Sequence, residues 1–172
     1  MKQISKIKYV ILIIAIFAGF SCMFTIGVQG KAIKLFFEGT AIEFDFQVLE
    51  TWMEEDVYHM KYYRKSTISG LMDGIEFIGY NEAYGHLKIE PSGDYTGHGT
   101  VTAYITWNGF VGTYYGPFNI KGFMPVIPSR GDFTGKYIGH GDGDFDGWKQ
   151  FGTSWDLDEG GYGFSGTTLI PN

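Results

Sequence analysis

Glycine spacing near the C-terminus constrains the fold more than any other feature of this chain. Residues 131–170 read GDFTGKYIGHGDGDFDGWKQFGTSWDLDEGGYGFSGTTLI, with a glycine every few residues between aromatic, threonine and aspartate residues. Each glycine inside a helix costs about 1 kcal/mol relative to alanine, so an amphipathic helix is disfavoured here. Glycine does permit the bulges and close backbone contacts of short, strongly twisted strands. The segment therefore predicts about three strands of a closed or nearly closed antiparallel sheet.

Alternating side chains predict further strands before this segment. Within 41–49, Ile42, Phe44, Phe46 and Val48 alternate with polar residues, which predicts a strand with one buried face and one wet face. We expect further strands at 57–67, 75–80, 84–90, 100–107 and 111–120, with interruptions at 51–56, 70–74 and 81–82. Asn108-Gly109 is the best hairpin signal, because both residues tolerate the positive φ of a type I′ turn.

Eight to nine short strands at even spacing are typical of an all-β barrel or sandwich. We predict a single antiparallel up-and-down barrel of about eight strands over residues 31–172, preceded by an apolar N-terminal helix that serves as a signal or an anchor. No helical segment of ten residues is expected after the N-terminus.

The N-terminal thirty residues predict a location outside the cytoplasm. Three lysines precede an uncharged apolar run at residues 9–28, followed by small residues near position 30. This order is that of a secretory signal, although an apolar run of this length also suffices to cross a bilayer as an uncleaved anchor. Acylation of Cys22 is a third, weaker alternative. All three place residues 31–172 in a secreted or extracytoplasmic domain, in contact with a membrane only through residues 9–28 if they are retained.

Charge and cysteine content exclude several kinds of partner and site. The residues after position 30 contain ten basic and 19 acidic side chains, so phosphate backbones and anionic membrane surfaces would be repelled. We therefore expect no nucleic-acid partner. The chain's one cysteine, Cys22, lies in the N-terminal segment, which excludes a disulfide framework or a cysteine zinc site in the domain. With no P-loop and no dinucleotide fingerprint, we expect no cofactor.

The C-terminal strands resemble a known group of barrels. Gly141, Gly143, Phe145 and Gly147 form a Gly-x-Gly-x-Phe-x-Gly pattern, which is followed by Gly152-Thr153 with Trp155 and then by Tyr162 with Gly166. These elements resemble the closing hairpins of uncharacterised secreted proteins of the allene oxide cyclase-like barrel group. The resemblance is clear over about a quarter of the chain and implies an eight-stranded antiparallel barrel with a central cavity. It implies no catalytic residue, since none of the matched positions is a reacting group.

An acidic run offers a candidate metal site. Asp142, Asp144 and Asp146, followed by Gly147, match the first half of a calcium loop. The position that needs a bidentate glutamate is Thr153, and no helix is expected before the run. The favoured alternative is a solvated strand face, shared by period two with His140.

The histidines offer a second candidate. His98 and His140 both stand in Gly-His-Gly and could meet as a metal pair or as an acid and a base. Neither has a spacing specific for zinc, and surface or hydrogen-bonded histidines are the favoured interpretation. His59 and His86 are weaker candidates.

The aromatic surplus is the strongest functional feature of the sequence. Aromatic residues make up 18% of the chain, and an eight-stranded barrel is wide enough to be filled by side chains or to hold one small ligand. Packing of the core is the favoured interpretation, and a pocket for an apolar ligand is the alternative. If a pocket exists, the expected lining includes Trp107, Trp148, Trp155, Tyr104 and Phe118.

Three functions therefore remain open. The first is a module that binds a small apolar or aromatic molecule in the barrel, without catalysis. The second is a cofactor-free isomerase or cyclase that uses the same cavity. The third is a structural or surface-interaction domain with a filled barrel. An open cavity with a buried carboxylate or histidine would favour the enzyme.

Overall fold

A computed structural model of the chain describes residues 31–125, 132–157 and 161–171. The predicted signal or anchor lies outside the described residues. The described residues from Ala32 to Pro171 belong to one compact unit. Within these ranges there is no helix long and apolar enough to cross a membrane.

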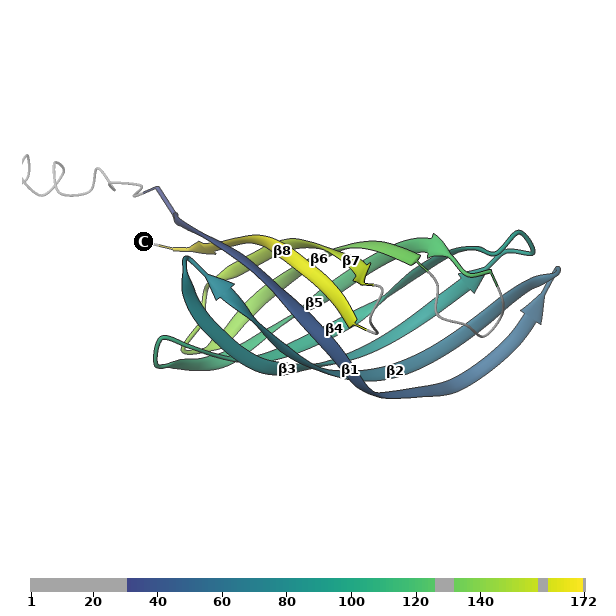
Figure 1. Cartoon of the computed structure of the whole chain (residues 1–172), viewed down its shortest axis with the longest axis horizontal. Helices are drawn as coiled ribbons and strands as arrows, with labels where there is room; N and C mark the ends of the chain where they lie inside the picture. Colours follow the sequence, from purple (N-terminus) through teal and green to yellow (C-terminus); the bar gives the residue numbers. More distant parts are fainter. Residues whose placement is uncertain (1–30, 126–131, 158–160, 172) are drawn as a thin grey trace, which may run out of the picture. The chain divides into compact units, whose positions relative to one another are not determined.

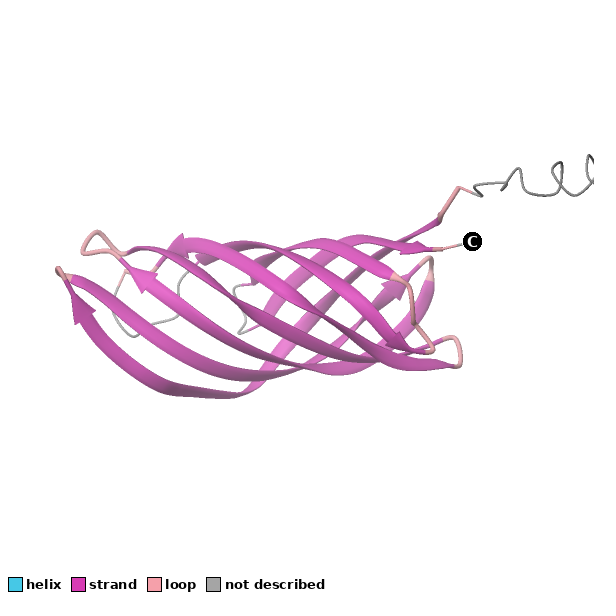
Figure 2. Cartoon of the chain, turned by 180° about the vertical axis from the view of Figure 1, so that it is seen from behind, coloured by secondary structure: helices cyan, strands magenta, loops and turns pink. Residues whose placement is uncertain are grey.

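Eight antiparallel strands close into a barrel, each hydrogen-bonded to its neighbours in the sequence (Figures 1 and 2). Closure is made by the first and last strands, which pair from Ile33 with Ile170 to Ile42 with Gly161. This confirms the predicted up-and-down barrel. The strands are β1 (Ile33–Glu54), β2 (Val57–Met72), β3 (Ile75–Ile89), β4 (Asp94–Trp107), β5 (Phe110–Phe123), β6 (Asp132–Gly143), β7 (Lys149–Leu157) and β8 (Gly161–Ile170).

Side chains alternate between the barrel interior and its outer wall, as the pleat of a strand requires. On β2, for example, Met60 and Tyr62 are buried, while Lys61 between them is exposed. The interior contains two clusters of buried residues. The first includes Leu35, Phe37, Ala41, Ile68, Met72, Phe77, Ile105, Trp107, Tyr114, Phe145, Tyr162 and Phe164. The second includes Met60, Tyr62, Ala83, Leu87, Ile89, Tyr95, Phe118 and Met124.

Strand β1 departs from the predicted alternation. Register shifts occur between Glu43 and Asp45 and between Val48 and Glu50, and each reverses which side of the strand faces inward. Ile42, before the first shift, is 64% exposed, and Val48, after it, is 49% exposed. The prediction that 42, 44, 46 and 48 form one buried face is therefore wrong, because the chain inserts bulges that a period of two does not reveal.

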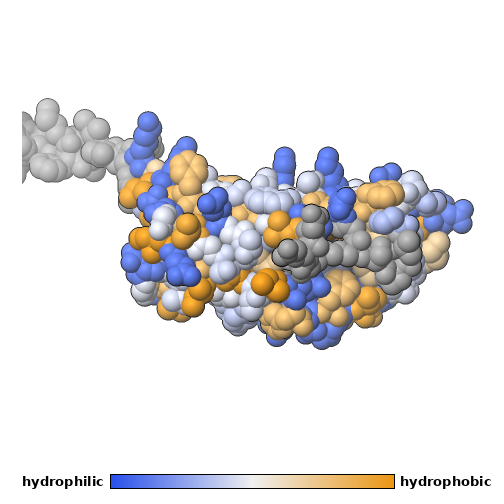
Figure 3. Space-filling view, viewed as in Figure 1, coloured by the Kyte–Doolittle hydropathy of each residue, from blue (hydrophilic) through white to orange (hydrophobic). Residues whose placement is uncertain are grey.

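The apolar residues past Ile42 stay exposed for a second reason. Phe46 stacks on the buried Tyr62 with ring centroids 5.5 Å apart, yet Phe46 is 46% exposed. Strand β8 pairs with β1 only as far as Ile42, so no described strand lies on the second side of β1 beyond that point. Figure 3 shows apolar and polar residues interspersed over one face of the protein.

Two predicted interruptions are continuous strand. Residues 81–82 belong to β3, where Asn81 is buried in the barrel and donates a hydrogen bond to the Tyr162 hydroxyl at 2.6 Å. Glu82, on the outer wall, pairs with Lys65 at 2.8 Å. Likewise, the interruption predicted at 51–56 shrinks to Glu55-Asp56, both with positive φ. Polar residues need not interrupt a strand of a barrel. An inward one such as Asn81 can find a hydrogen-bond partner across the interior, and an outward one such as Glu82 can pair on the wall.

An aromatic plug fills one end of the barrel. Phe145, in the turn after β6, is fully buried and packs on Tyr114 and Trp148 with centroid distances of 5.1 and 5.2 Å. Trp148 also meets Trp107 edge-on at 6.0 Å. The indole N–H of Trp107 donates to the Met72 carbonyl at 3.1 Å, so this buried ring satisfies its polar atom.

Replacing Phe145 by alanine should lower the free energy of unfolding by about 3–5 kcal/mol, since it empties a fully buried aromatic site. Phe151→Ala is the matched control, because Phe151 is 40% exposed on the outer wall. Urea unfolding of both variants measures the difference. Equal losses of stability in the two variants would contradict the plug.

Candidate functional site

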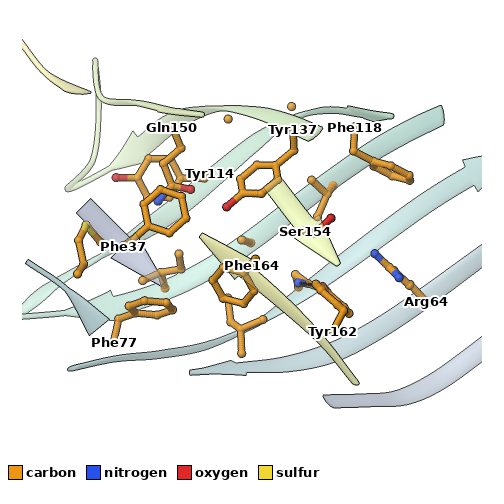
Figure 4. A pocket seen from close by; sticks show the side chains of 18 of the residues that line it. Phe37, Arg64, Phe77, Tyr114, Phe118, Tyr137, Gln150, Ser154, Tyr162 and Phe164 are labelled. Carbon is orange, nitrogen blue, oxygen red and sulfur yellow. Dashed lines mark hydrogen bonds between the residues drawn. The ribbon is translucent and has the colours of Figure 1, made fainter. Parts of the chain in front are cut away.

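A cavity of about 80 Å³ lies inside the barrel, with a lining that includes residues of both buried clusters (Figure 4). Phe37 and Phe77 lie toward one end of it, while Phe118 and Arg64 lie toward the other. Tyr137 and Tyr162 face it from β6 and β8. The lumen is thus largely filled by side chains, with a small apolar space left between them.

Arg64 is the one charged residue among those that line the cavity. Its guanidinium lies over the Tyr162 ring at 4.6 Å from the centroid, a cation–π contact. Its Nε is buried and has no hydrogen-bond partner. Burial alone lowers the pKa of Arg64, but Tyr162, Tyr62 and Glu43 outweigh that effect and hold the pKa above its ordinary value. The cavity therefore contains a permanent positive charge.

A second polar atom at the cavity lacks a partner. Asn81 donates its amide hydrogen to Tyr162, but its Oδ1 is buried and accepts no hydrogen bond. A buried unpartnered acceptor costs roughly 1–3 kcal/mol, which a bound molecule or water can recover. Arg64 and Asn81 thus contribute an unused donor and an unused acceptor, and the buried hydroxyl of Tyr114, which also lines the cavity, has no hydrogen-bond partner either.

The interior tyrosines are held neutral. Burial raises the pKa of Tyr114 and of Tyr137, which both line the cavity, and Tyr162 adds to the effect on Tyr137. Burial likewise raises the pKa of Tyr62 and Tyr95, and Arg64 partly offsets the effect on each. These phenols can donate hydrogen bonds at neutral pH but cannot act there as phenolate bases.

Of the five residues expected to line a pocket, Phe118 lines this cavity. Trp107 and Trp148 belong to the aromatic plug. Tyr104 stacks on Tyr80 at 4.5 Å, and Trp155 is 39% exposed. Tyr104 and Trp155 point outward because the alternation of side chains places them on the outer side of β4 and β7.

The acidic run forms a turn. Asp144 accepts a hydrogen bond from the Val111 amide at 2.8 Å, and Asp142 accepts one from the Gly143 amide at 2.8 Å. Strand β6 ends at Gly143, so Asp144 and Asp146 do not share a strand face with His140 as expected. Two carboxylates therefore support the turn that carries the plug residue Phe145.

Three histidines come together on the outer wall, in a different combination from the one expected. His98 on β4 and His140 on β6 are separated by β5. His98 lies instead opposite His86 on β3, and His86 is hydrogen-bonded to His59 on β2. Burial, with His59 and His98 next in effect, lowers the pKa of His86. Within the described residues, no group of three or more His, Cys, Asp or Glu is placed to hold a metal ion.

A signal for this histidine cluster was present in the sequence. A tight hairpin at Pro91–Asp94 sets His86 opposite His98. A tight hairpin at Glu55-Asp56 sets Trp52 opposite His59. The second turn was predicted too broadly, which hid that pairing.

Comparison with known proteins finds no matching family model, no similar curated protein and no similar solved structure. The function is therefore inferred from the site itself.

Alkaline titration tests the buried phenols. An ordinary tyrosine pKa is about 10, so above that pH the unfolded chain loses protons that the folded chain keeps. The free energy of unfolding should be unaffected by these groups below pH 10 and should fall as the pH rises above it. Tyrosinate absorbance should then show a late step that coincides with unfolding followed by circular dichroism.

Tyr137→Phe should shift this alkaline transition to higher pH, while Tyr80→Phe on the exposed outer wall should leave it in place. Full ionisation of the tyrosines while the barrel remains folded would contradict the assigned burial.

Proposed function

We propose that this domain binds a small apolar or aromatic molecule inside the barrel, without catalysis. The observation that supports this most directly is the cavity inside the barrel with its aromatic lining, at which Arg64 and Asn81 keep unused polar atoms. Small-molecule sites combine such apolar walls with a few placed polar groups. A fully packed core would have neither the space nor the unpartnered atoms.

The size of the cavity limits the ligand. At about 80 Å³ it has roughly half the volume of the ~150 Å³ apolar cavity that admits benzene. A molecule smaller than benzene fits with the side chains as they are. A single aromatic ring fits when one lining side chain moves, and the ligand's polar group then lies at Arg64 or Asn81.

The cavity gives less support to an isomerase or cyclase. Among the residues that line it, neither a carboxylate nor an imidazole is present to move a proton, and burial raises the pKa of Tyr114 and Tyr137, which keeps these two phenols neutral. The filled barrel with a structural role is the remaining alternative, and ligand binding distinguishes it from the proposal.

The proposed location is outside the cytoplasm. The support comes from the lysines and the apolar run of the N-terminal thirty residues, whose order is that of a secretory signal or an anchor. A small molecule available outside the cytoplasm would then be the natural ligand class.

Filling the cavity should abolish binding. Ala103 lines the cavity from β4, and Ala103→Leu puts a larger side chain into that space. Phenol, a ring with one hydroxyl, is the probe. It should raise the melting temperature of the wild type but not that of Ala103→Leu. Thr102→Leu, one residue away on the outer wall, should respond as the wild type does.

Native mass spectrometry of the protein purified from its own host gives an independent measurement. A retained small molecule in the wild type, absent from Ala103→Leu, supports the proposal. A clean apo mass together with no thermal response to phenol would leave the structural role.

A further inference from the structure

Three of the protein's four histidines converge on one patch of the outer wall. His59, His86 and His98 lie on the neighbouring strands β2, β3 and β4, and Trp52 and Glu54 reach the patch from β1. The patch is separate from the cavity, because its residues occupy outward positions of the strands while the cavity residues occupy inward ones. We call these five residues the histidine patch.

Two imidazoles of the histidine patch face each other directly. The Nδ1 atom of His59 lies 3.0 Å from the Nε2 atom of His86. The ring centroids are 5.2 Å apart and the ring planes differ by 22°. The distance between the centroids is about the distance between the two nitrogens plus the distance from each nitrogen to the centre of its own ring. The two nitrogens therefore lie nearly on the line between the ring centres and point toward each other. One of them carries a hydrogen, and the pair shares that proton.

The surroundings are those of a histidine ligand with an outer-shell partner. Glu54 lies 3.7 Å from the other nitrogen of His59, Nε2, and favours the tautomer with its hydrogen there. That tautomer leaves the lone pair of Nδ1 directed at His86. Trp52 stacks on both rings, with centroids 4.8 Å from His59 and 5.1 Å from His86, which fixes their planes.

We propose that His59 Nδ1 and His86 Nε2 bind a divalent first-row transition-metal ion of the kind that prefers imidazole. Zinc–nitrogen bonds of 2.0–2.1 Å in a tetrahedral site place two ligand nitrogens ~3.3 Å apart, close to the separation observed. A small rotation of the rings makes the lone pairs converge on the ion. In the tautomer that Glu54 favours, the shared hydrogen is on His86 Nε2. As the metal binds, that hydrogen is lost from Nε2 and one is taken up at His86 Nδ1, so both imidazoles stay neutral.

His59 is 8% exposed and His86 is half-buried, so the remaining coordination positions lie toward the exposed His98. His98 is exposed and meets the His86 ring edge-on at 5.4 Å, so its side chain can turn to supply a third nitrogen. Water fills the remaining positions. Of the nearby charges, the Glu54 carboxylate favours a bound cation. The positive charge of Lys61 opposes one, but Lys61 is paired with Glu50 at 2.6 Å and lies over the Trp52 ring, 5.3 Å from its centroid.

Trp52 provides a direct readout of binding. Cu²⁺ is the probe, because among the divalent first-row metal ions it binds a given nitrogen site most tightly. Titration of the full-length protein with Cu²⁺ should quench part of the tryptophan fluorescence, since Trp52 stacks on both ligands. Isothermal titration calorimetry should record the heat of saturable binding. Zn²⁺ should compete with the copper.

Single-residue variants locate the site. His59→Gln and His86→Gln should each lose saturable copper binding at concentrations that saturate the wild type. His140→Gln removes the one histidine outside the patch and should bind normally. Glu54→Gln should weaken binding by about tenfold, the lower end of the range for outer-shell partners. Trp52→Phe should lose the fluorescence change and keep the calorimetric signal.

Each result decides the proposal once circular dichroism shows that the variant retains the barrel. Copper binding that persists in both His59→Gln and His86→Gln, or that is lost in His140→Gln, would overturn it. So would a wild-type protein that binds neither Cu²⁺ nor Zn²⁺, which would make the histidine pair a structural hydrogen bond alone.

Discussion

Closure of the sheet by β1 and β8 is the constraint on which the rest of the structure depends. Ten successive residues of β1 pair with β8, and through this seam all eight strands form one ring. A ring of eight strands encloses a space that side chains nearly fill. The seam also needs glycine where an aromatic side chain lies across β1. A Cβ at Gly39 would collide with the Ser69 carbonyl and the Phe164 side chain. The cavity, the plug and the outer histidine patch all take their positions from this ring.

The interior balances apolar packing against a few polar groups. Most inward positions carry aromatic or aliphatic side chains, yet Arg64, Asn81 and Tyr162 meet in the interior. A charge in such surroundings is costly unless it is compensated. The Tyr162 ring and the Coulombic effects of Tyr62 and Glu43 supply part of that compensation. The unused Nε of Arg64 indicates that this compensation is incomplete, which is the physical argument for the ligand that we propose.

The fold could be predicted from the sequence because glycine spacing, hairpin signals and period-two alternation are local. Asn108-Gly109 forms a two-residue turn with both φ values positive, as its chemistry requires. The bulges of β1 could not be predicted, because the residues at 42–48 alternate as they would in a regular strand. The site was harder still. Which aromatic residues face inward depends on register: Phe118 lines the cavity, while Tyr104 and Trp155 lie on the wall. Arg64 shares the inward phase of Met60 and Tyr62, but an arginine is rarely buried, so its residue type argues against the position that alternation gives it.

The bulged half of β1 has a consequence for how copies of this protein behave when crowded. A long strand with one unpaired side and exposed phenylalanines is a template on which further chains can add and grow into fibrils. Two irregularities within a few residues twist that side out of line, and Asp45 and Glu54 add negative charge to it, while Glu50 between them is paired with Lys61. A second copy would bring the same negative charges against the first. Among the described residues this flank of β1 is left without a partner strand, and its bulges and acidic side chains disfavour the addition of a second chain there.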